Sequence, residues 1–133
     1  MPKSIFLAGA TGAVGRRLVP LLVEAGHRVT GTTRAKEKAE ALRALGATPA
    51  VIDVFDMAAL KDAMKMAAPD VVIHQLTDLS LLADPARRAE ALERNARLRI
   101  EGTANLVAAA LLSGARRMIA QSISFVYAPG RQP

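Results

Sequence analysis

Several residue types that support particular functions are absent or rare in this sequence of 133 residues. It contains no cysteine and no tryptophan, and its 3% aromatic content comes from three phenylalanines and one tyrosine. The absence of cysteine excludes a disulfide framework, a thiolate metal site and a cysteine nucleophile from this chain. So few aromatic side chains offer little for stacking nucleic-acid bases. The aliphatic and charged residues must therefore carry the fold and the function.

Long apolar runs are also missing. No stretch of the sequence approaches the roughly twenty apolar residues that a helix needs to span a bilayer. The apolar N-terminus is interrupted by glycines from Gly9 onward, which is too early for a secretory signal peptide. We therefore expect a cytoplasmic protein with no membrane partner.

The composition that remains is typical of one globular domain. Hydrophobic residues make up 51% of the chain and charged residues 23%, which excludes intrinsic disorder. Eighteen Lys and Arg against twelve Asp and Glu give a net charge of +6. Because the basic residues are spread along the chain rather than clustered, we expect no nucleic-acid partner.

Short apolar, β-branched runs alternate with helical patterns along the chain. Strands are expected over residues 5–8, 28–33, 48–52, 71–74 and 117–121, and helices over 13–25, 35–45, 57–67 and 84–113. This alternation predicts an α/β fold, a doubly wound parallel sheet with helices on both faces. Because crossovers between parallel strands are right-handed, the expected strand order is 3-2-1-4-5.

The last expected helix is the longest. It begins at Asp84, a suitable N-cap, with Pro85 in its first turn, and it ends at Ser113 before a glycine. Seven apolar residues at helical spacing form one face of it. They are Ala89, Leu92, Ala96, Ile100, Ala104, Val107 and Leu111, and the arginines of this segment lie mostly off that face.

A glycine-rich turn directly after the first strand is the strongest chemical signal. Its sequence is Gly9-Ala10-Thr11-Gly12-Ala13-Val14-Gly15, and it opens the first helix. The first glycine permits a tight turn, the second lets a pyrophosphate approach the backbone, and the third lets the helix pack closely on the sheet. The N–H groups at the helix N-terminus then attract phosphate. The turn predicts a dinucleotide-binding site.

The end of the second strand indicates which dinucleotide. An NAD site usually has an acidic residue there, whereas this sequence has Thr33-Arg34 with two lysines close behind. A guanidinium matches a 2′-phosphate, so NADP(H) is preferred and NAD(H) remains an alternative. Asp53, at the end of the third strand, is placed either to meet an adenine edge or to form a turn.

Taken together, these motifs resemble the extended and atypical short-chain dehydrogenase/reductases, in particular the NAD(P)-dependent epimerase/dehydratase group. The matching segments are residues 9–15, 53–54, 72–76, 102–106 and 122–127. The resemblance implies a Rossmann fold with the cofactor across the carboxyl ends of the strands. It places Gly9, Thr11, Gly12, Ala13, Val14 and Gly15 at the pyrophosphate, Thr33 and Arg34 at the adenosine ribose, Asp53 and Val54 at the adenine, and Leu76 and Thr77 on the nicotinamide side.

The catalytic residues of that family match less well. Its members use a Tyr-x-x-x-Lys pair as the acid/base, and the only tyrosine here, Tyr127, belongs instead to the motif of the fifth strand. The family also has a Ser or Thr that orients the substrate carbonyl. This position aligns with Ile123, so either of its neighbours, Ser122 or Ser124, is the candidate catalytic residue.

Two other residues stand at notable positions. Arg99 occupies a place where the family often has Asn. His74 ends the fourth strand, where the resemblance implies a structural role, hydrogen bonding to backbone near the switch point of the sheet, rather than proton transfer.

These observations predict the cofactor-binding part of an oxidoreductase, epimerase or dehydratase. Hydride would pass between the nicotinamide and a small carbonyl or hydroxyl substrate, of which sugars are one class. The substrate subdomain and the Tyr-x-x-x-Lys pair are expected beyond residue 133, so this chain alone would bind cofactor without turnover. The alternative is a non-catalytic module that senses NADP(H). Family members often dimerise through the helix spanning Asp84 to Ser113, which makes a homodimer a further expectation.

Overall fold

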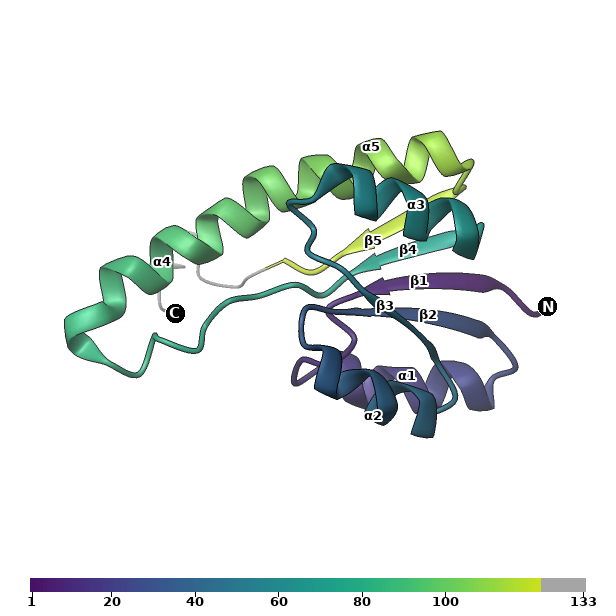
Figure 1. Ribbon diagram of the computed structural model, residues 1–133, viewed down its shortest axis with the longest axis horizontal. Helices are drawn as coiled ribbons and strands as arrows, with labels where there is room; N and C mark the ends of the chain where they lie inside the picture. Colours follow the sequence, from purple (N-terminus) through teal and green to yellow (C-terminus); the bar gives the residue numbers. More distant parts are fainter. Residues whose placement is uncertain (123–133) are drawn as a thin grey trace, which may run out of the picture.

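The computed structural model describes residues 1–122, which form a five-stranded parallel sheet with helices on both faces (Figure 1). The strands are β1 (Ser4–Ala8), β2 (Arg28–Thr33), β3 (Thr48–Val51), β4 (Val71–His74) and β5 (Arg117–Ala120). Their order in the sheet is β3-β2-β1-β4-β5, and every neighbouring pair is parallel. The predicted Rossmann-type topology is confirmed.

The helices form two layers. On one face lie α1 (Gly15–Glu24), the short helix η1 (Lys36–Lys38) and α2 (Ala39–Ala44). On the other face lie α3 (Met57–Ala67) and α5 (Thr103–Ser113), as Figure 1 shows. The short helix η2 (Pro85–Arg87), α4 (Arg88–Arg97) and the π-helical turn η3 (Leu98–Gly102) precede α5 in one nearly continuous rod. None of these helices is long and apolar enough to cross a membrane.

The central strand explains why the two layers form. All five residues of β1 are buried, and successive side chains point to opposite faces of the sheet. Phe6 belongs to the core under α3 and α5, whereas Leu7 belongs to the core under α1 and α2. A strand buried on both faces reads as a continuous apolar run, and this is the pattern in the sequence.

The long helix differs from its prediction in two ways. It is interrupted by the π turn η3, and its predicted apolar face lies on the outside, with Ile100 75% exposed and Leu111 74% exposed. The buried positions are instead Ala91, Leu98, Gly102, Leu106, Ala109 and Ala110. The reason is that Leu98 and Leu106 pack in the same core cluster as Phe6, so this stripe of the helix faces the sheet.

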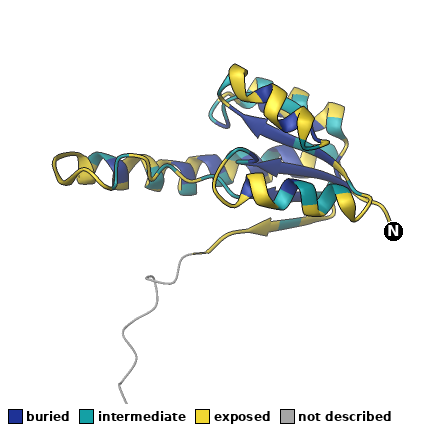
Figure 2. Cartoon of the chain, turned by 90° about the horizontal axis from the view of Figure 1, so that it is seen from below, coloured by how far each residue is buried: buried dark blue, intermediate teal, exposed yellow. Residues whose placement is uncertain are grey.

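The sheet is buried at its centre and open at the β5 edge. Figure 2 shows β1 and its neighbours in dark blue and β5 mostly in yellow. Three of the four β5 residues are exposed, and Ile119 is 48% exposed. The rod that contains α4 also extends past the sheet and is largely exposed (Figure 2). The β5 edge of the sheet is therefore much less covered than β4, whose last residue, His74, is buried.

Candidate nicotinamide-dinucleotide site

Two glycines of the turn after β1 are required by close backbone contacts. Gly9 has a φ of +85°, and a Cβ on it would lie 2.7 Å from the carbonyl oxygen of Gln75. A Cβ on Gly15 would collide with the carbonyl oxygen of Gly9. The first glycine thus makes the turn, and the third brings α1 against it, as the sequence predicts.

The middle glycine is different because the space beside it is open. A Cβ on Gly12 would meet only the carbonyl oxygen of Gly9, at 3.4 Å. Ala13 and Val14 follow it on the surface, and in residues 1–122 no hydrogen bond takes up their N–H groups. Open space and free N–H groups at the start of a helix are what a phosphate requires.

The end of β2 holds the glycine turn in place. The Thr32 hydroxyl oxygen accepts a hydrogen bond of 3.0 Å from the Gly9 N–H. A Cβ on Gly31 would lie only 2.6 Å from the Cβ of Ala10. The absence of a side chain at Gly31 therefore lets the glycine turn pack directly against β2. Sequence reasoning missed both residues, since nothing in a strand pattern indicates which tertiary partner a given position will have.

A cleft of about 220 Å³ runs along the carboxyl ends of the strands from this turn. Nine predicted site residues line it: Gly9, Thr11, Gly12, Thr33, Arg34, Asp53, Val54, Leu76 and Thr77. The structure thus gathers residues from four separate segments, as the resemblance implies. Ala13, Val14 and Gly15 do not line it, and Lys38 and Gln75 line it without having been predicted.

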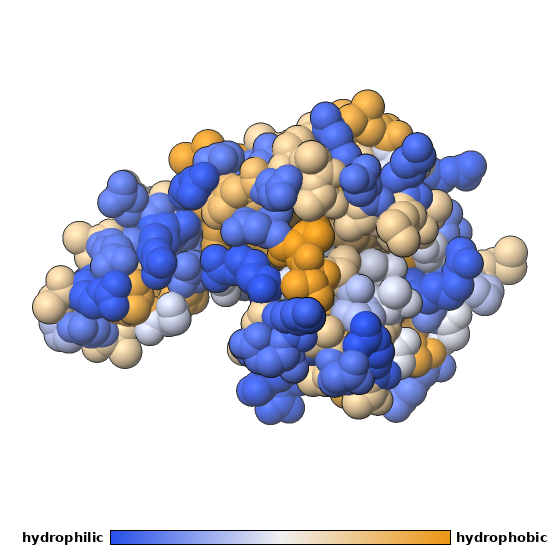
Figure 3. Space-filling model, viewed as in Figure 1, coloured by the Kyte–Doolittle hydropathy of each residue, from blue (hydrophilic) through white to orange (hydrophobic). Residues whose placement is uncertain are grey.

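A second hollow opens beside the end of β2. Thr11, Thr33, Arg34, Ala35 and Lys38 line a volume of about 430 Å³. The two cations are exposed, whereas Thr33 is buried and its hydroxyl oxygen accepts from the Ala35 N–H at 3.2 Å. In Figure 3 much of the surface in the lower part of the view, where Figure 1 places α2, is hydrophilic. The hollow therefore presents two positive charges and hydroxyl groups to a ligand.

The loop after β3 forms the opposite wall of the cleft. The Asp53 carboxylate accepts a hydrogen bond of 2.9 Å from the Phe55 N–H, so this residue lines the cleft and also forms the turn that sequence reasoning kept as an alternative. The side-chain amide of Asn105 on α5 donates to the carbonyl oxygen of Val54 at 3.0 Å. The amide thereby fixes the loop to the helix layer.

His74 holds the backbone where β4 leaves the sheet. Its Nδ1 accepts from the Leu76 N–H at 3.2 Å, and its Nε2 lies 2.9 Å from the hydroxyl oxygen of Thr103. Because Nδ1 accepts, the neutral ring carries its proton on Nε2 and donates it to Thr103. Burial, followed by the charge of Arg99, lowers the pKa of His74 below that of an ordinary histidine. The geometry is that of the backbone-bonding residue expected from the sequence.

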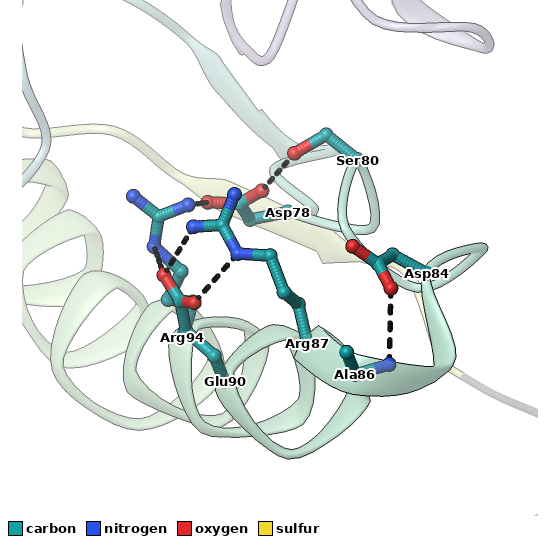
Figure 4. Close-up of polar contacts among 7 residues, drawn as sticks. All are labelled: Asp78, Ser80, Asp84, Ala86, Arg87, Glu90 and Arg94. Carbon is teal, nitrogen blue, oxygen red and sulfur yellow. Dashed lines mark hydrogen bonds and ion pairs between the residues drawn. The ribbon is translucent and has the colours of Figure 1, made fainter.

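The segment beyond Leu76 and Thr77 is tied to α4. The Asp78 N–H donates to the Asn95 side chain at 3.3 Å, and the Asp78 carboxylate lies 3.9 Å from the Arg94 guanidinium. Figure 4 shows Glu90 between Arg94 and Arg87. The Arg87 guanidinium donates two hydrogen bonds of 3.0 Å to the Glu90 carboxylate. These contacts hold the loop that follows Leu76 and Thr77.

One of the two candidate catalytic serines, Ser122, belongs to the described residues. Ser122 follows β5 and is exposed, one residue after Gln121, whose N–H donates to the His74 carbonyl oxygen at 3.2 Å. Ser124, together with Ile123 and Tyr127, lies outside the described residues. In residues 1–122 no group of three His, Asp or Glu side chains is arranged to hold a metal ion.

Comparison with known families agrees with this geometry. A family model described as NAD(P)H-binding matches residues 9–133. The chain belongs to the NAD(P)H-binding family. The expected resemblance to short-chain dehydrogenase/reductases is confirmed as well, since solved structures of that superfamily share its fold.

The individual relatives are longer proteins. The chain is 46% identical over 130 residues to a 3-diazoavenalumate denitrifying reductase from a Streptomyces species, a match that covers 97% of this chain and 40% of that protein. It resembles an NAD-bound short-chain dehydrogenase/reductase superfamily protein from Agrobacterium tumefaciens, with 29% identity, a TM-score of 0.66 and coverage of 87% and 31%. A UDP-glucose-4-epimerase from Stenotrophomonas maltophila with bound NAD shares the fold, with 20% identity, a TM-score of 0.77 and coverage of 98% and 40%.

Proposed function

We propose that this NAD(P)H-binding domain prefers NADP(H) and serves a reductase of the short-chain dehydrogenase/reductase type. The observation that carries the preference is the hollow at the end of β2, where Arg34 and Lys38 stand with hydroxyl groups and without a carboxylate. A 2′-phosphate brings two negative charges to this place, and a guanidinium can bind it through two parallel hydrogen bonds. An acidic residue there would favour NAD instead.

The remaining cleft residues suit the other parts of the cofactor. The pyrophosphate is assigned to Gly12 and the N–H groups of Ala13 and Val14, because the space beside them is open. The adenine is assigned to the loop of Asp53 and Val54. Leu76 and Thr77 border the nicotinamide side. When bound, the cofactor supplies the hydride chemistry, and the chain binds and orients it.

Cofactor choice is tested by titrating the protein with NADPH and with NADH. NADPH should bind at least about tenfold more tightly, and Arg34→Ala and Lys38→Ala should each reduce that ratio while leaving NADH affinity unchanged. Lys36→Ala is the matched control, since Lys36 is exposed, two residues away, and lines neither hollow. Equal affinities for the two cofactors in the unmodified protein would refute the preference.

The proposed reaction is hydride transfer between the nicotinamide and a small carbonyl or hydroxyl substrate. Its support is the Streptomyces relative, a reductase that this chain matches over 97% of its own length. Ser122, or Ser124, would orient the reacting oxygen, and epimerisation or dehydration are other outcomes of the same cofactor chemistry. We propose that part of the substrate site lies in sequence beyond this domain, since the chain spans 40% of that reductase.

A non-catalytic, NADP(H)-sensing role is the second candidate. It is favoured by Ile123, which stands at the position where the family has a hydroxyl side chain. The two candidates differ in turnover. Oxidation of NADPH that depends on an added aldehyde or ketone supports the reductase, whereas tight NADPH binding without oxidation of any such compound supports the sensor.

We also propose that the protein forms a homodimer through the exposed apolar face of the α4–α5 rod. Leu92, Ile100, Val107 and Leu111 follow this face at helical spacing, and apolar patches of this kind mark interaction sites. A two-fold symmetric contact pairs the same patch on both copies. Leu111→Glu should yield a monomer by light scattering, whereas Met66→Glu, on α3 and 88% exposed, should leave the dimer intact. A monomeric unmodified protein would refute the proposal.

A further inference from the structure

Arg99 is held over the carboxyl ends of β4 and β5. It lies in the π turn η3, and its Nη1 donates to the carbonyl oxygen of Gln121 at 3.1 Å. Ser122, a candidate for orienting the substrate, comes directly after that carbonyl. Doubly wound sheets bind their ligands at the carboxyl ends of the strands, so the guanidinium stands where a substrate would enter.

The charge of Arg99 has no counter-ion among the described residues. Three other arginines of the rod pair with acids: Arg87 with Glu90, Arg94 with Asp78 and Glu90, and Arg97 with Glu101. Within residues 1–122, no carboxylate lies within ion-pair distance of Arg99. All twelve Asp and Glu residues of the sequence belong to this described part.

The hydrogen-bonding capacity of Arg99 is also incompletely used. Its Nε is buried and has no acceptor among the described residues, while the side chain as a whole is only partly buried. A carboxylate binds a guanidinium through two parallel N–H···O bonds, and the edge formed by Nε and Nη2 is available for such a pair once the side chain turns it outward. In the described conformation Nη1 donates to the carbonyl oxygen of Gln121, directly after β5, so the guanidinium stays at this edge of the sheet.

The neighbourhood of Arg99 connects it to the nicotinamide side of the cleft. Its charge contributes to lowering the pKa of His74, which therefore stays neutral at physiological pH and adds no second positive charge. The same His74 ring accepts from the N–H of Leu76, a residue that lines the cofactor cleft. An anion on Arg99 would thus lie next to the cofactor's reactive end and away from the cations that face the adenosine ribose.

We propose that Arg99 binds a carboxylate of the substrate and thereby selects small organic acids as the compounds that the enzyme reduces. The inference rests on the proposed reductase function, because it names the substrate class of that site. A phosphate ester offers the same kind of oxyanion and is the alternative that the experiment separates. Arg99 is a specificity-determining residue in this proposal, with no part in proton or hydride transfer.

The experiment uses benzoate as the carboxylate probe on the protein saturated with NADP⁺. Benzamide is the neutral control and methyl phosphate the phosphate control. Nitrogen-15 NMR follows the arginine Nε–H signals, and the Arg99 signal is identified by its loss in Arg99→Lys. Benzoate should shift that signal whereas benzamide should not, and Arg99→Gln should weaken benzoate binding about tenfold or more. Arg88→Gln, which removes an exposed charge from α4 in the same rod, should leave benzoate binding unchanged.

Several results would overturn the proposal. They are the absence of benzoate binding to the unmodified protein, equal binding of benzamide, equal benzoate binding by Arg99→Gln, or a signal shift with methyl phosphate alone. If Arg99→Gln fails to fold, the NMR titration of the unmodified protein still decides. NADPH affinity is measured separately for each variant and should not change. If the unmodified protein does not bind NADPH, the proposed function is refuted. If it binds NADPH but not benzoate, only the role of Arg99 is refuted.

Discussion

The end of the cleft proposed to hold the phosphates and adenosine (the cofactor end) differs from the proposed substrate end in how closely contacts within the domain hold its backbone. At the first end, Gly9 is bonded to Thr32, and the loop at Val54 is bonded to Asn105. At the second end, β5 is exposed and the buried Nε of Arg99 has no described partner. The difference teaches that contacts within this domain already shape the proposed cofactor site, whereas the proposed substrate end leaves a polar group for a ligand to pair.

The largest expected effect tests how rigid the cofactor end is. Gly15→Ala places a Cβ into the Gly9 carbonyl and should lower the free energy of unfolding by about 3 kcal/mol or more. Gly12→Ala adds a methyl group into open space, so stability should change by less than about 1 kcal/mol while NADPH affinity falls about tenfold. Urea denaturation and NADPH titration of both variants measure these quantities. Similar losses of stability in the two variants would show that the turn is held by something other than these contacts.

Sequence reasoning predicted the elements at the cofactor end better than the long helix that leads to the substrate end. Strand β2, strand β4 and helix α3 have the bounds that the sequence predicts, because local patterns, turn residues and the Asp56 N-cap determine them. The glycine turn was predictable for a similar reason, since its requirement is local backbone geometry. The cofactor end is therefore largely encoded in short segments.

The orientation of the long helix was not predictable in this way. Its residues form two stripes with nearly the same spacing, and the more hydrophobic one, with Leu92 and Ile100, is exposed. The other stripe faces the core, because Leu98 and Leu106 pack against the sheet and the Thr103 hydroxyl oxygen lies 2.9 Å from Nε2 of His74. Hydrophobicity alone cannot reveal such contacts, since they depend on partners distant in the sequence.

A smaller effect is expected from the hydrogen bond between β2 and the glycine turn. Thr32→Val keeps the shape of a buried side chain but leaves the Gly9 N–H without its acceptor, which should cost about 1 to 3 kcal/mol of unfolding free energy. Thr30→Val is the control, because Thr30 lies on the same face of β2 two residues earlier and its hydroxyl takes part in no described hydrogen bond. If the two variants lose equal stability, the Thr32 hydroxyl is not what holds the turn.

The pH dependence of stability tests the role of His74, which lies between the two ends of the cleft. Because the pKa of His74 is lower in the folded protein than the value of about 6.5 in an unfolded chain, the unfolded state binds more protons as pH falls below 6.5. Stability from this residue is complete above pH 6.5 and is lost as pH falls from there toward the folded pKa. Protonation also ends the bond that Nδ1 accepts from Leu76, so the loss should be on the order of 1 kcal/mol. Urea titrations at several pH values measure it.

The matched comparison is between His74→Asn and His27→Asn. His27 lies at the turn before β2, where its Nδ1 accepts from the Lys3 N–H at an exposed site. The variant without His74 should be less stable at neutral pH and should show a flatter pH profile between pH 5 and 7. An unchanged slope in that variant would mean that other groups govern acid sensitivity.

The smallest effect is expected from removing a helix N-cap, and it is measured at α3 beside the sheet and at η2 at the start of the rod. Asp56 caps α3 by accepting from the Ala59 N–H, and α3 buries Leu60 and Met64 completely, so Asp56→Ala should cost about 1 kcal/mol of global stability. Asp84 accepts from the Ala86 N–H in the same manner, but the turn η2 that it caps has no buried residue.

Asp84→Ala should therefore cost only a few tenths of a kcal/mol in global unfolding. The ion pairs of Glu90 with Arg87 and Arg94 lie one turn further on and keep α4 joined after the cap is lost (Figure 4). The missing cap should appear instead as faster amide hydrogen exchange confined to the start of the rod. Equal global losses in the two variants would mean that the rod unfolds together with the sheet, and the two ends of the cleft would then be one cooperative unit.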